Sequence, residues 1–191
     1  MNLAQFETHT IWDIPLKAHP AQVRRCLHFY GKTKFIQWKP FGKSKALEFS
    51  IKFWSERRMK VFKKAWAIHF EEGKTCRVTP GSFERGVLEE RASFKAVIKN
   101  VPTTAVEVLL LRQLRVVNAK AVYISHNKNQ NQRRTATVYF GSHEELEAAL
   151  VRKVYYLDVK LEWINIQNKS RREIVKEETN NRGVEFQVVE A

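Results

Sequence analysis

The chain has 191 residues, 43% of them hydrophobic, and carries a formal net charge of +14 at pH 7. The hydrophobic fraction excludes a wholly disordered chain, and the length suits one large domain or two small ones. A charge this positive favours a polyanionic partner, most often nucleic acid and less often a membrane surface, with a merely soluble basic protein as the plain alternative.

The two cysteines, Cys26 and Cys76, lie far apart, and neither has a Cys or His neighbour at metal-ligand spacing. This spacing predicts no metal site and no disulfide framework, and it favours a reducing intracellular compartment, nuclear or cytoplasmic. The N-terminus lacks the pattern of a secretory signal, and no apolar run approaches the roughly 20 residues of a membrane-spanning helix. We therefore expect no membrane partner.

Hydrophobic periodicity and turn residues divide the first 80 residues into alternating strands and helices. Pro20 opens a helix at a position where proline costs no hydrogen bond, and Gly31 is a natural stop. Ser55 is the N-cap of a second helix. The predicted elements, in chain order, are strand 8–16, helix 20–30, strand 34–39, strand 45–53, helix 56–66 and strand 75–79.

The same order of elements returns after a polar segment. Thr104 and Glu107 have the spacing of a capping box, and so do Ser142 and Glu145. The predicted elements are strand 94–101, helix 104–117, strand 120–125, a loop at 126–132, strand 133–140, helix 142–153 and strand 161–164.

Each half thus follows the order β-α-β-β-α-β, which is the ferredoxin-like arrangement of two helices on one face of a four-stranded antiparallel sheet. We predict an α+β protein with two such domains in tandem. The predicted boundaries are a first domain at 1–80, a linker at 81–93 in which a short helix is considered, a second domain at 94–166 and a charged C-terminal tail at 167–191, with an extra strand considered at 184–189. The repeat is one of architecture, with a period of about 87 residues from Ile14-Pro15 to Val101-Pro102.

The strand 133–140 has the outline of the signature strand of an RNA-recognition motif. Ala136, Val138 and Phe140 alternate with Arg133 and three further residues on the outer face. Asn100 and Pro102, at the end of the predicted strand 94–101, match the end of the family's first strand. With these residues the chain resembles a tandem pair of RNA-recognition motifs over residues 8–80 and 94–166. The resemblance implies binding of single-stranded nucleic acid on the open sheet faces.

The positions that carry base-stacking aromatic rings in that family hold other residues here. They are Thr10, Glu48, Ser50, Val97, Thr135 and Thr137. One stacked base contributes about 1–3 kcal/mol to binding, so most of the usual stacking platform is missing. Three aromatic residues have the right parity to act as substitutes on the open faces, and these are Trp12, Tyr123 and Tyr139. The alternatives are rings that cap the surface or lie in an interface, and a one-residue shift in register, which would bury all three.

Charge distribution is the stronger indication. Residues 1–80 hold 16 basic and 6 acidic side chains, and residues 94–166 hold 11 and 6. Basic residues flank equivalent loops of the two halves, so these loops are expected to clamp one phosphate backbone. The predicted phosphate contacts are Lys43, Lys45, Lys128, Arg133 and Arg134. The predicted hydrogen-bonding groups on the sheets are Ser50, Lys52, Lys99, Thr135 and Thr137. A second basic group, on the helix at 56–66, is interpreted as a solvated face, with a second nucleic-acid surface as the alternative.

These patterns predict a non-catalytic protein that binds RNA or another single-stranded nucleic acid with weak sequence preference. No histidine stands at a recognisable catalytic spacing, and no Walker loop or dinucleotide fingerprint occurs, so neither an enzyme nor a cofactor is expected. Guide-RNA-processing ribonucleases with paired ferredoxin-like units are excluded by the missing glycine-rich loop. The alternative is a module of the same fold that docks a peptide or partner domain, which the empty aromatic positions favour and the charge opposes. The oligomeric state is left open.

Overall fold

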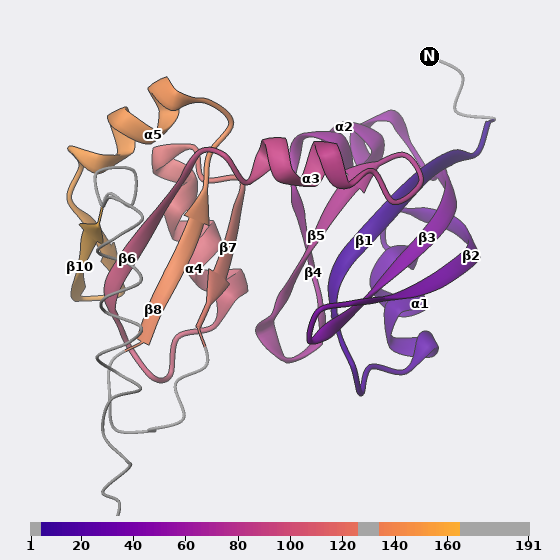
Figure 1. The fold of residues 1–191 in the computed structure, drawn as a ribbon, viewed down its shortest axis with the longest axis horizontal. Coiled ribbons are helices and arrows are strands. Elements are labelled where there is room, and N and C mark those ends of the chain that lie inside the picture. The colour runs from indigo at the N-terminus through magenta and orange to yellow at the C-terminus, as the bar shows by residue number, and fades with distance from the viewer. Residues whose placement is uncertain (1–4, 126–133, 165–191) are drawn as a thin grey trace, which may run out of the picture.

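The computed structural model describes residues 5–125 and 134–164. Within these ranges the elements alternate as the sequence predicts, and Figure 1 shows them as two bodies joined by a short helix. The elements are β1 (Glu7–Pro15), α1 (Pro20–His28), β2 (Gly31–Phe41), β3 (Ser44–Phe53), α2 (Glu56–Lys64), β4 (Ala67–His69), η1 (Glu71–Gly73), β5 (Thr75–Pro80), α3 (Arg85–Arg91), β6 (Lys95–Val101), α4 (Glu107–Leu114), η2 (Arg115–Val117), β7 (Ala121–Ile124), β8 (Arg134–Tyr139), α5 (His143–Leu150), β9 (Val154–Tyr156) and β10 (Val159–Ile164).

Each body contains one antiparallel sheet, and the two sheets have equivalent strand orders. The first domain is ordered β2-β3-β1-β5-β4 and the second β7-β8-β6-β10-β9. The first four strands of each order form the ferredoxin-like sheet, so the predicted α+β fold with two such domains is confirmed. Sequence analysis missed β4 and β9, which are three-residue strands that extend each sheet to five.

A β-bulge recurs at the same place in both domains. The register of β1 shifts between Ile11 and Ile14, and that of β6 shifts between Ile98 and Val101. At the bulges Asp13 and Asn100 adopt positive φ values of 63° and 66°. Asn and Asp tolerate this left-handed conformation better than other residues with a side chain. The bulge therefore explains why Asp or Asn precedes the aliphatic-proline pair in both halves.

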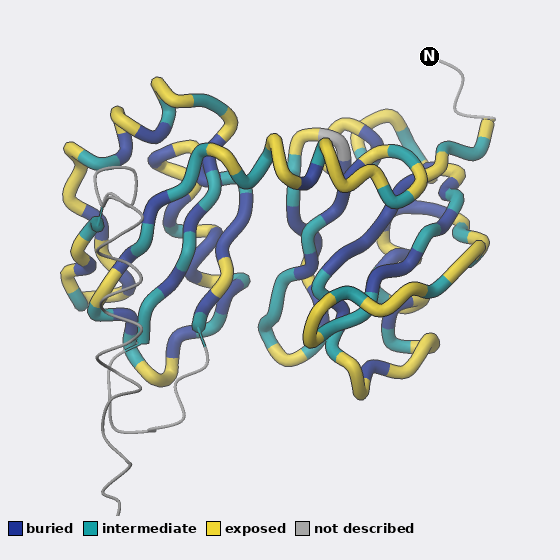
Figure 2. Tube along the Cα trace, viewed as in Figure 1, coloured by how far each residue is buried: buried dark blue, intermediate teal, exposed yellow. Residues whose placement is uncertain are grey.

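Two apolar cores hold the helices against the sheets. The first is built on Leu47, Phe49 and Ile51 of β3, and the second on Ala136 and Val138 of β8 together with Phe140. All six side chains are buried, so the predicted inward face of the signature strand is correct for its described part. Figure 2 shows buried and partly exposed residues alternating along the central strands, as expected for sheets with one covered face.

The segment predicted as a linker contains a helix that packs back on the first domain. Leu88 of α3 is buried beside Trp12 and Ala46, with Phe41 and Phe83 at the margin of this small cluster. Figure 1 shows α3 bridging the two bodies. Part of the sheet face opposite the main core of the first domain is therefore covered by the chain itself.

The predicted capping box at the start of α4 does not form. Val106 is the N-cap, without a side-chain hydrogen bond, and the Glu107 side chain turns towards the other domain. Its carboxylate accepts hydrogen bonds from the Thr75 backbone N–H (2.7 Å) and from the Ile124 N–H (3.1 Å), and the Thr75 hydroxyl lies 3.2 Å from it. Glu107 is 6% exposed. A buried carboxylate with two backbone donors holds strand β5 of one domain against β7 and α4 of the other.

Replacing Glu107 with Ala is expected to loosen this junction. The buried amides of Thr75 and Ile124 lose their acceptor, at a cost of about 1–3 kcal/mol for each unsatisfied group. Amide hydrogen exchange should then speed up at Thr75 and Ile124, and the free energy of unfolding should fall. Glu147→Ala, on the exposed face of α5, is the matched control and should change neither. Unaltered protection of both amides in Glu107→Ala would contradict this role.

Candidate nucleic-acid interface

The open faces of the two sheets lie next to one another and point in the same direction. Figure 1 shows β1, β3 and β2 in front of α1, and β6, β8 and β7 in front of α4. At the junction the Thr75 hydroxyl donates to the Val122 carbonyl oxygen at 3.0 Å. On the open side the Arg77 guanidinium lies 5.5 Å from the centre of the Tyr139 ring. The molecule thus presents two neighbouring sheet surfaces held in a defined relation.

Rows of residues that face each other across the strands make up the first open face. Strand pairing sets Thr10 beside Glu48 and Thr79, Ser50 beside Thr8 and Lys34, and Lys52 directly beside Lys32. Lys32, Lys34 and Lys52 are all exposed. The end of this face nearest the C-terminus of β3 is therefore strongly basic, whereas Glu48 lies towards its middle.

The middle of the first open face is closed by the chain that follows β5. The Thr10 side chain, in a stacking position of the family, donates to the Gly81 carbonyl oxygen (2.9 Å) and accepts from the Phe83 N–H (2.8 Å). Thr10 and Thr79 are 0% exposed. A base has no access to this position while residues 81–83 lie over it.

The prediction that Trp12 is an exposed stacking residue is wrong. Its parity is right, because it lies on the face opposite the main core, but it is 1% exposed. Its indole N–H donates to the Thr79 hydroxyl at 2.8 Å, and the Phe41 and Phe83 rings pack beside it at 4.9 and 6.1 Å between centroids. The reason is α3 and its connector, which the sequence pattern presented as a linker.

The second open face is more accessible and brings several predicted residues together. One row across the sheet contains Ile164, Val97, Thr137 and Tyr123, which pair in that order. Tyr123 is 50% exposed. Lys99 is exposed at one end of the face and Thr135 lies on the neighbouring strand, where its hydroxyl lies 2.7 Å from that of Ser125. Tyr123 is thus the predicted aromatic that has a free ring surface here.

Tyr139 belongs to the junction between the domains. It is partly buried, packs on the second core and lies under Arg77, whose guanidinium forms a bidentate ion pair with Asp13 at 2.6 and 3.0 Å. Burial raises the pKa of the Tyr139 phenol, as expected for a ring held away from water. The structure therefore assigns this ring a packing role, in place of the free stacking role that was predicted.

Arg134 was predicted to contact phosphate, and the structure contradicts this. Its Nη2 atom donates to the carbonyl oxygens of Pro102 (3.1 Å), Thr103 (2.5 Å) and Ala105 (2.7 Å). These carbonyls belong to the connection between β6 and α4. The guanidinium is already used to hold that connection against β8.

The remaining predicted loop residues divide into three cases. Lys43 is exposed beside Gly42 in the β2–β3 turn, where a phosphate can reach it. Lys45 is half-buried and points towards α1, with its ammonium 3.5 Å from the Ala18 carbonyl oxygen, so its predicted place beside the open face is wrong. Lys128 and Arg133 lie outside the described residues, as do the tail and its considered strand.

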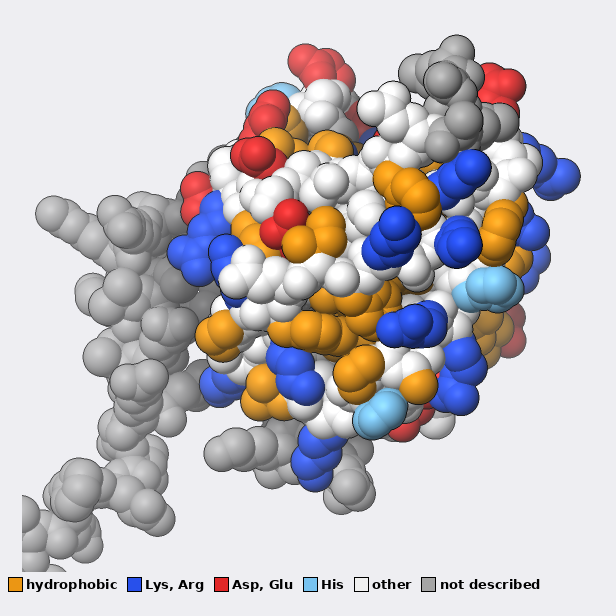
Figure 3. All heavy atoms as spheres, turned by 90° about the vertical axis from the view of Figure 1, so that its right-hand side faces the viewer, with side chains coloured by type: hydrophobic (Ala, Val, Ile, Leu, Met, Phe, Trp, Pro, Cys, Tyr) orange, Lys and Arg blue, Asp and Glu red, His pale blue; other side chains and the backbone are white. Residues whose placement is uncertain are grey.

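Sequence reasoning noted the basic group on the helix at 56–66 but missed the exposed aromatic residues beside it at the far edge of the first domain. Phe29 is 56% exposed and Trp54 55%, and Arg58 lies over the Phe29 ring at 3.4 Å. Figure 3 shows hydrophobic side chains gathered on this side of the molecule with Lys and Arg side chains around them. The available signal was Trp54 itself, an aromatic residue placed between the end of a strand and a helix N-cap.

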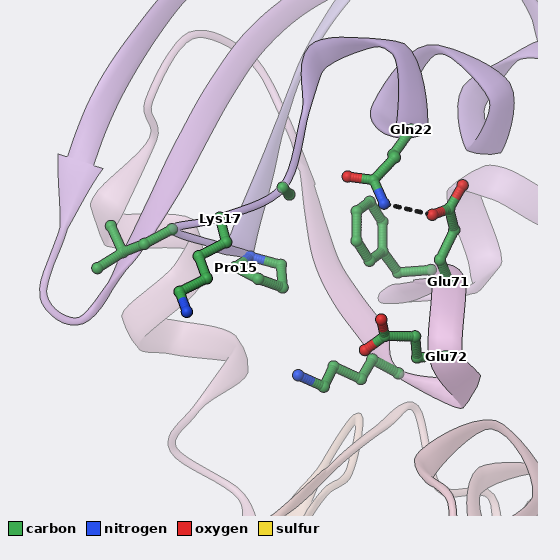
Figure 4. A pocket seen from close by; sticks show the side chains of 9 residues that line it. Pro15, Lys17, Gln22, Glu71 and Glu72 are labelled. Atoms are coloured by element: carbon green, nitrogen blue, oxygen red, sulfur yellow. Dashed lines mark hydrogen bonds between the residues drawn. The ribbon is translucent and has the colours of Figure 1, made fainter.

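A cavity of about 290 Å³ lies elsewhere, between the β1–α1 connection and η1. Figure 4 shows Gln22 and Glu71 on its wall, joined by a hydrogen bond of 2.5 Å, and Arg25 also pairs with Glu71. The cavity lies away from the open sheet faces, so it is not part of the candidate interface. Among the described residues no group of three His, Cys, Asp or Glu side chains is placed to hold a metal ion, and no helix there has the length and apolar character to cross a membrane.

No protein-family model and no curated protein matches the chain. Its structure is similar to three solved pairs of RNA-binding domains. These are RNA recognition domains 1 and 2 of Sex-lethal from Drosophila melanogaster (13% identity, 75% of this chain and 91% of that one, TM-score 0.31), the RNA-binding domain of Hrp1 in complex with RNA (12%, 86% and 97%, 0.39) and the first two RRM domains of yeast poly(U)-binding Pub1 (6%, 82% and 97%, 0.32). At these identities and TM-scores the likeness carries no conclusion about what this chain binds.

Replacing Arg134 with Ala should act mainly on stability. Three carbonyl groups lose a charged donor, so the free energy of unfolding in urea is expected to fall by about 2–3 kcal/mol. Arg57→Ala, which removes the same charge from an exposed position on α2, should change it by less than about 0.5 kcal/mol. If the two variants had the same free energy of unfolding, the structural role of Arg134 would be contradicted.

Proposed function

We propose that the protein binds single-stranded RNA, without catalysis, along the two adjoining open sheet faces. The single observation that carries the proposal is the pair of lysine-bearing open faces held side by side by the β5–β7 junction. The first contributes Lys32, Lys34 and Lys52, and the second contributes Lys95 and Lys99. The domain boundaries proposed with it are those predicted from the sequence.

The chemistry of these faces favours contacts to the phosphate backbone. Lysine is a point charge without the planar fork of arginine, so it attracts phosphates and carries little base specificity. Hydroxyl groups of Ser50 and Thr137 and the exposed ring of Tyr123 add contacts that tolerate many sequences. The expected binding is therefore dependent on salt and only weakly dependent on sequence.

Docking of a protein is the second candidate function. The observation that favours it is α3, a mostly polar helix that packs on the first open face through the buried side chain of Leu88. The charge of the remaining exposed part opposes it, because exposed lysines are depleted at the centres of protein interfaces. Salt dependence separates the two functions.

Fluorescence anisotropy with a labelled 12-nucleotide RNA of mixed sequence tests the proposal, with DNA of the same sequence in parallel. With three to four phosphate contacts the dissociation constant should rise about 20- to 50-fold between 50 and 200 mM salt. Absence of binding to either oligomer at 50 mM salt would overturn the function and leave protein docking.

The face that binds is tested by two variants that remove the same charge. The triple variant Lys34→Gln, Lys95→Gln and Lys99→Gln changes both open faces and should weaken binding roughly tenfold. The triple variant Arg57→Gln, Lys60→Gln and Lys64→Gln changes the exposed side of α2 and should weaken it less than about twofold. If the α2 variant lost more affinity than the open-face variant, the binding site would lie on the helices and not on the sheets.

A further inference from the structure

A strip of exposed apolar side chains lies on the helix side of the first domain, opposite its open sheet face. Phe29, at the end of α1, is 56% exposed, Trp54, just before α2, is 55% exposed, and Val61 of α2 is 45% exposed. Large apolar side chains gathered at one place on a surface, with charged groups around them, are typical of protein interaction sites. The strip is therefore a candidate docking surface, separate from the sheet.

Hydrogen bonding and helix geometry fix the members of this strip. The Trp54 indole N–H donates to the His28 carbonyl oxygen at 2.7 Å, which ties the ring to the end of α1. Arg58 lies over the Phe29 ring at 3.4 Å, and Val61 follows Arg58 by three residues on the same side of α2. Side chains whose positions are set before binding lose little conformational entropy when a partner packs on them.

Beyond Val61 the strip leads into a groove between the two domains. The groove has a volume of about 310 Å³ and lies between the end of α2 and the segment that runs from α4 to β7. Val61 and Ala65 line it from the first domain, and Leu111 and Ala119 line it from the second. Because both domains contribute apolar side chains, the groove depends on the β5–β7 junction that holds them together.

Cations also line this groove, and none of its described lining residues is acidic. The cations are Lys64 from the first domain and Arg115 and Lys120 from the second. Among the described residues, Lys120 pairs with Glu145 at 3.0 Å, whereas Lys64 and Arg115 are in no ion pair. The groove therefore combines apolar side chains with two positive charges that the chain itself does not neutralise.

The strip and the groove share one electrostatic environment. Burial raises the pKa of the Tyr30 phenol, and the positive charges of Arg115 and Arg58 both act on it in the opposite direction. Burial lowers the pKa of His69, and the charge of Arg115 lowers it further. A cation of the second domain and a cation of the first thus lie near the same tyrosine, so strip and groove form one continuous surface with positive charge along it.

We propose that this surface binds an acidic amphipathic helix of a partner protein. The apolar side of that helix packs on Phe29, Trp54 and Val61, and its carboxylates pair with Lys64 and Arg115. A groove bordered by helices accepts a further amphipathic helix through side-chain packing, and aromatic and arginine side chains are enriched at such interfaces. The inference goes beyond the proposed binding of RNA, because it uses the opposite side of the first sheet.

The chemistry of the groove favours a protein over a nucleic acid as its occupant. Its apolar lining is aliphatic, and among the described residues that line it there is no aromatic ring on which a base could stack. A phosphate backbone would neutralise the cations and leave Val61 and Leu111 in contact with water. A segment that carries both acidic and apolar side chains matches both parts of the lining.

NMR titration of the full chain with a synthetic peptide tests the proposal. The probe is a 16-residue peptide with leucine at every third or fourth position and glutamate at the others, and the control peptide has serine in place of each leucine. The backbone amide signals of Val61, Lys64 and Arg115 and the indole N–H signal of Trp54 should shift with the probe and much less with the control. Equal shifts with the two peptides, or shifts confined to the open sheet faces, would overturn the proposal.

A triple variant of the surface provides the second part of the test. Val61→Ser, Lys64→Gln and Arg115→Gln together remove one apolar side chain and two charges, so the affinity for the probe peptide should fall at least about tenfold. Unchanged amide signals of the two buried cores show that this variant is folded. An affinity equal to that of the original chain would contradict the proposal, whether or not RNA binds.

The matched control makes the same changes at exposed positions of the second domain that lie outside the groove. It combines Val151→Ser, Lys153→Gln and Lys160→Gln and should alter the affinity for the peptide less than about twofold. A similar loss in both variants would show an unspecific effect of charge and would overturn the proposal.

Binding of the 12-nucleotide RNA separates this inference from the proposed function. The groove variant should bind the RNA within about twofold of the original chain, because its changes lie away from the open faces. If it loses RNA binding instead, the groove is a nucleic-acid surface and the docking proposal fails. If no RNA binds to the original chain but the peptide does, the proposed function fails and the docking surface stands.

Discussion

The arrangement of the whole molecule depends on one buried carboxylate. Glu107 accepts hydrogen bonds from both domains, and its two backbone donors, the N–H groups of Thr75 and Ile124, come from strand ends at the junction. A neutral apolar residue there would leave these N–H groups without partners in a place that water does not reach. Because β5 and β7 are held together at this point, the two open faces adjoin.

The second constraint is the way the chain covers part of its own surface. Residues 81–83 satisfy Thr10, and Leu88 of α3 packs with Trp12 and Ala46. This packing buries apolar area that a bare sheet would expose, so it stabilises the first domain. The same packing removes the middle of that sheet from a ligand. The middle of this face therefore serves stability, and the exposed lysines Lys32, Lys34 and Lys52 lie on the part that the chain leaves open.

Sequence patterns predict what depends on local physics. Strand alternation, the proline and glycine stops and the Ser55 and Ser142 caps act within a few residues, and the elements they predict are present. The errors at Trp12, Tyr139 and Arg134 share one cause. Parity assigns a side chain to a face, but only tertiary structure decides whether α3, Arg77 or a loop of carbonyl groups then covers it. The Glu107 capping box failed in the same way, since a buried partner in another domain outweighed a local cap.

Among the described residues, some cations of the first domain are in ion pairs and others are not. The first domain carries most of the positive charge, yet its ion pairs Arg77–Asp13 and Arg25–Glu71 use cations that lie away from Lys32 and Lys52. A sheet selected for stability alone would have an acidic residue at one of these two facing positions, where opposite charges contribute up to about 1 kcal/mol. Two lysines that face each other across β2 and β3 repel one another, so this pair contributes nothing to the stability of the sheet. Among the described residues, the positive charge of the first open face is therefore not neutralised in the way that Asp13 and Glu71 neutralise Arg77 and Arg25.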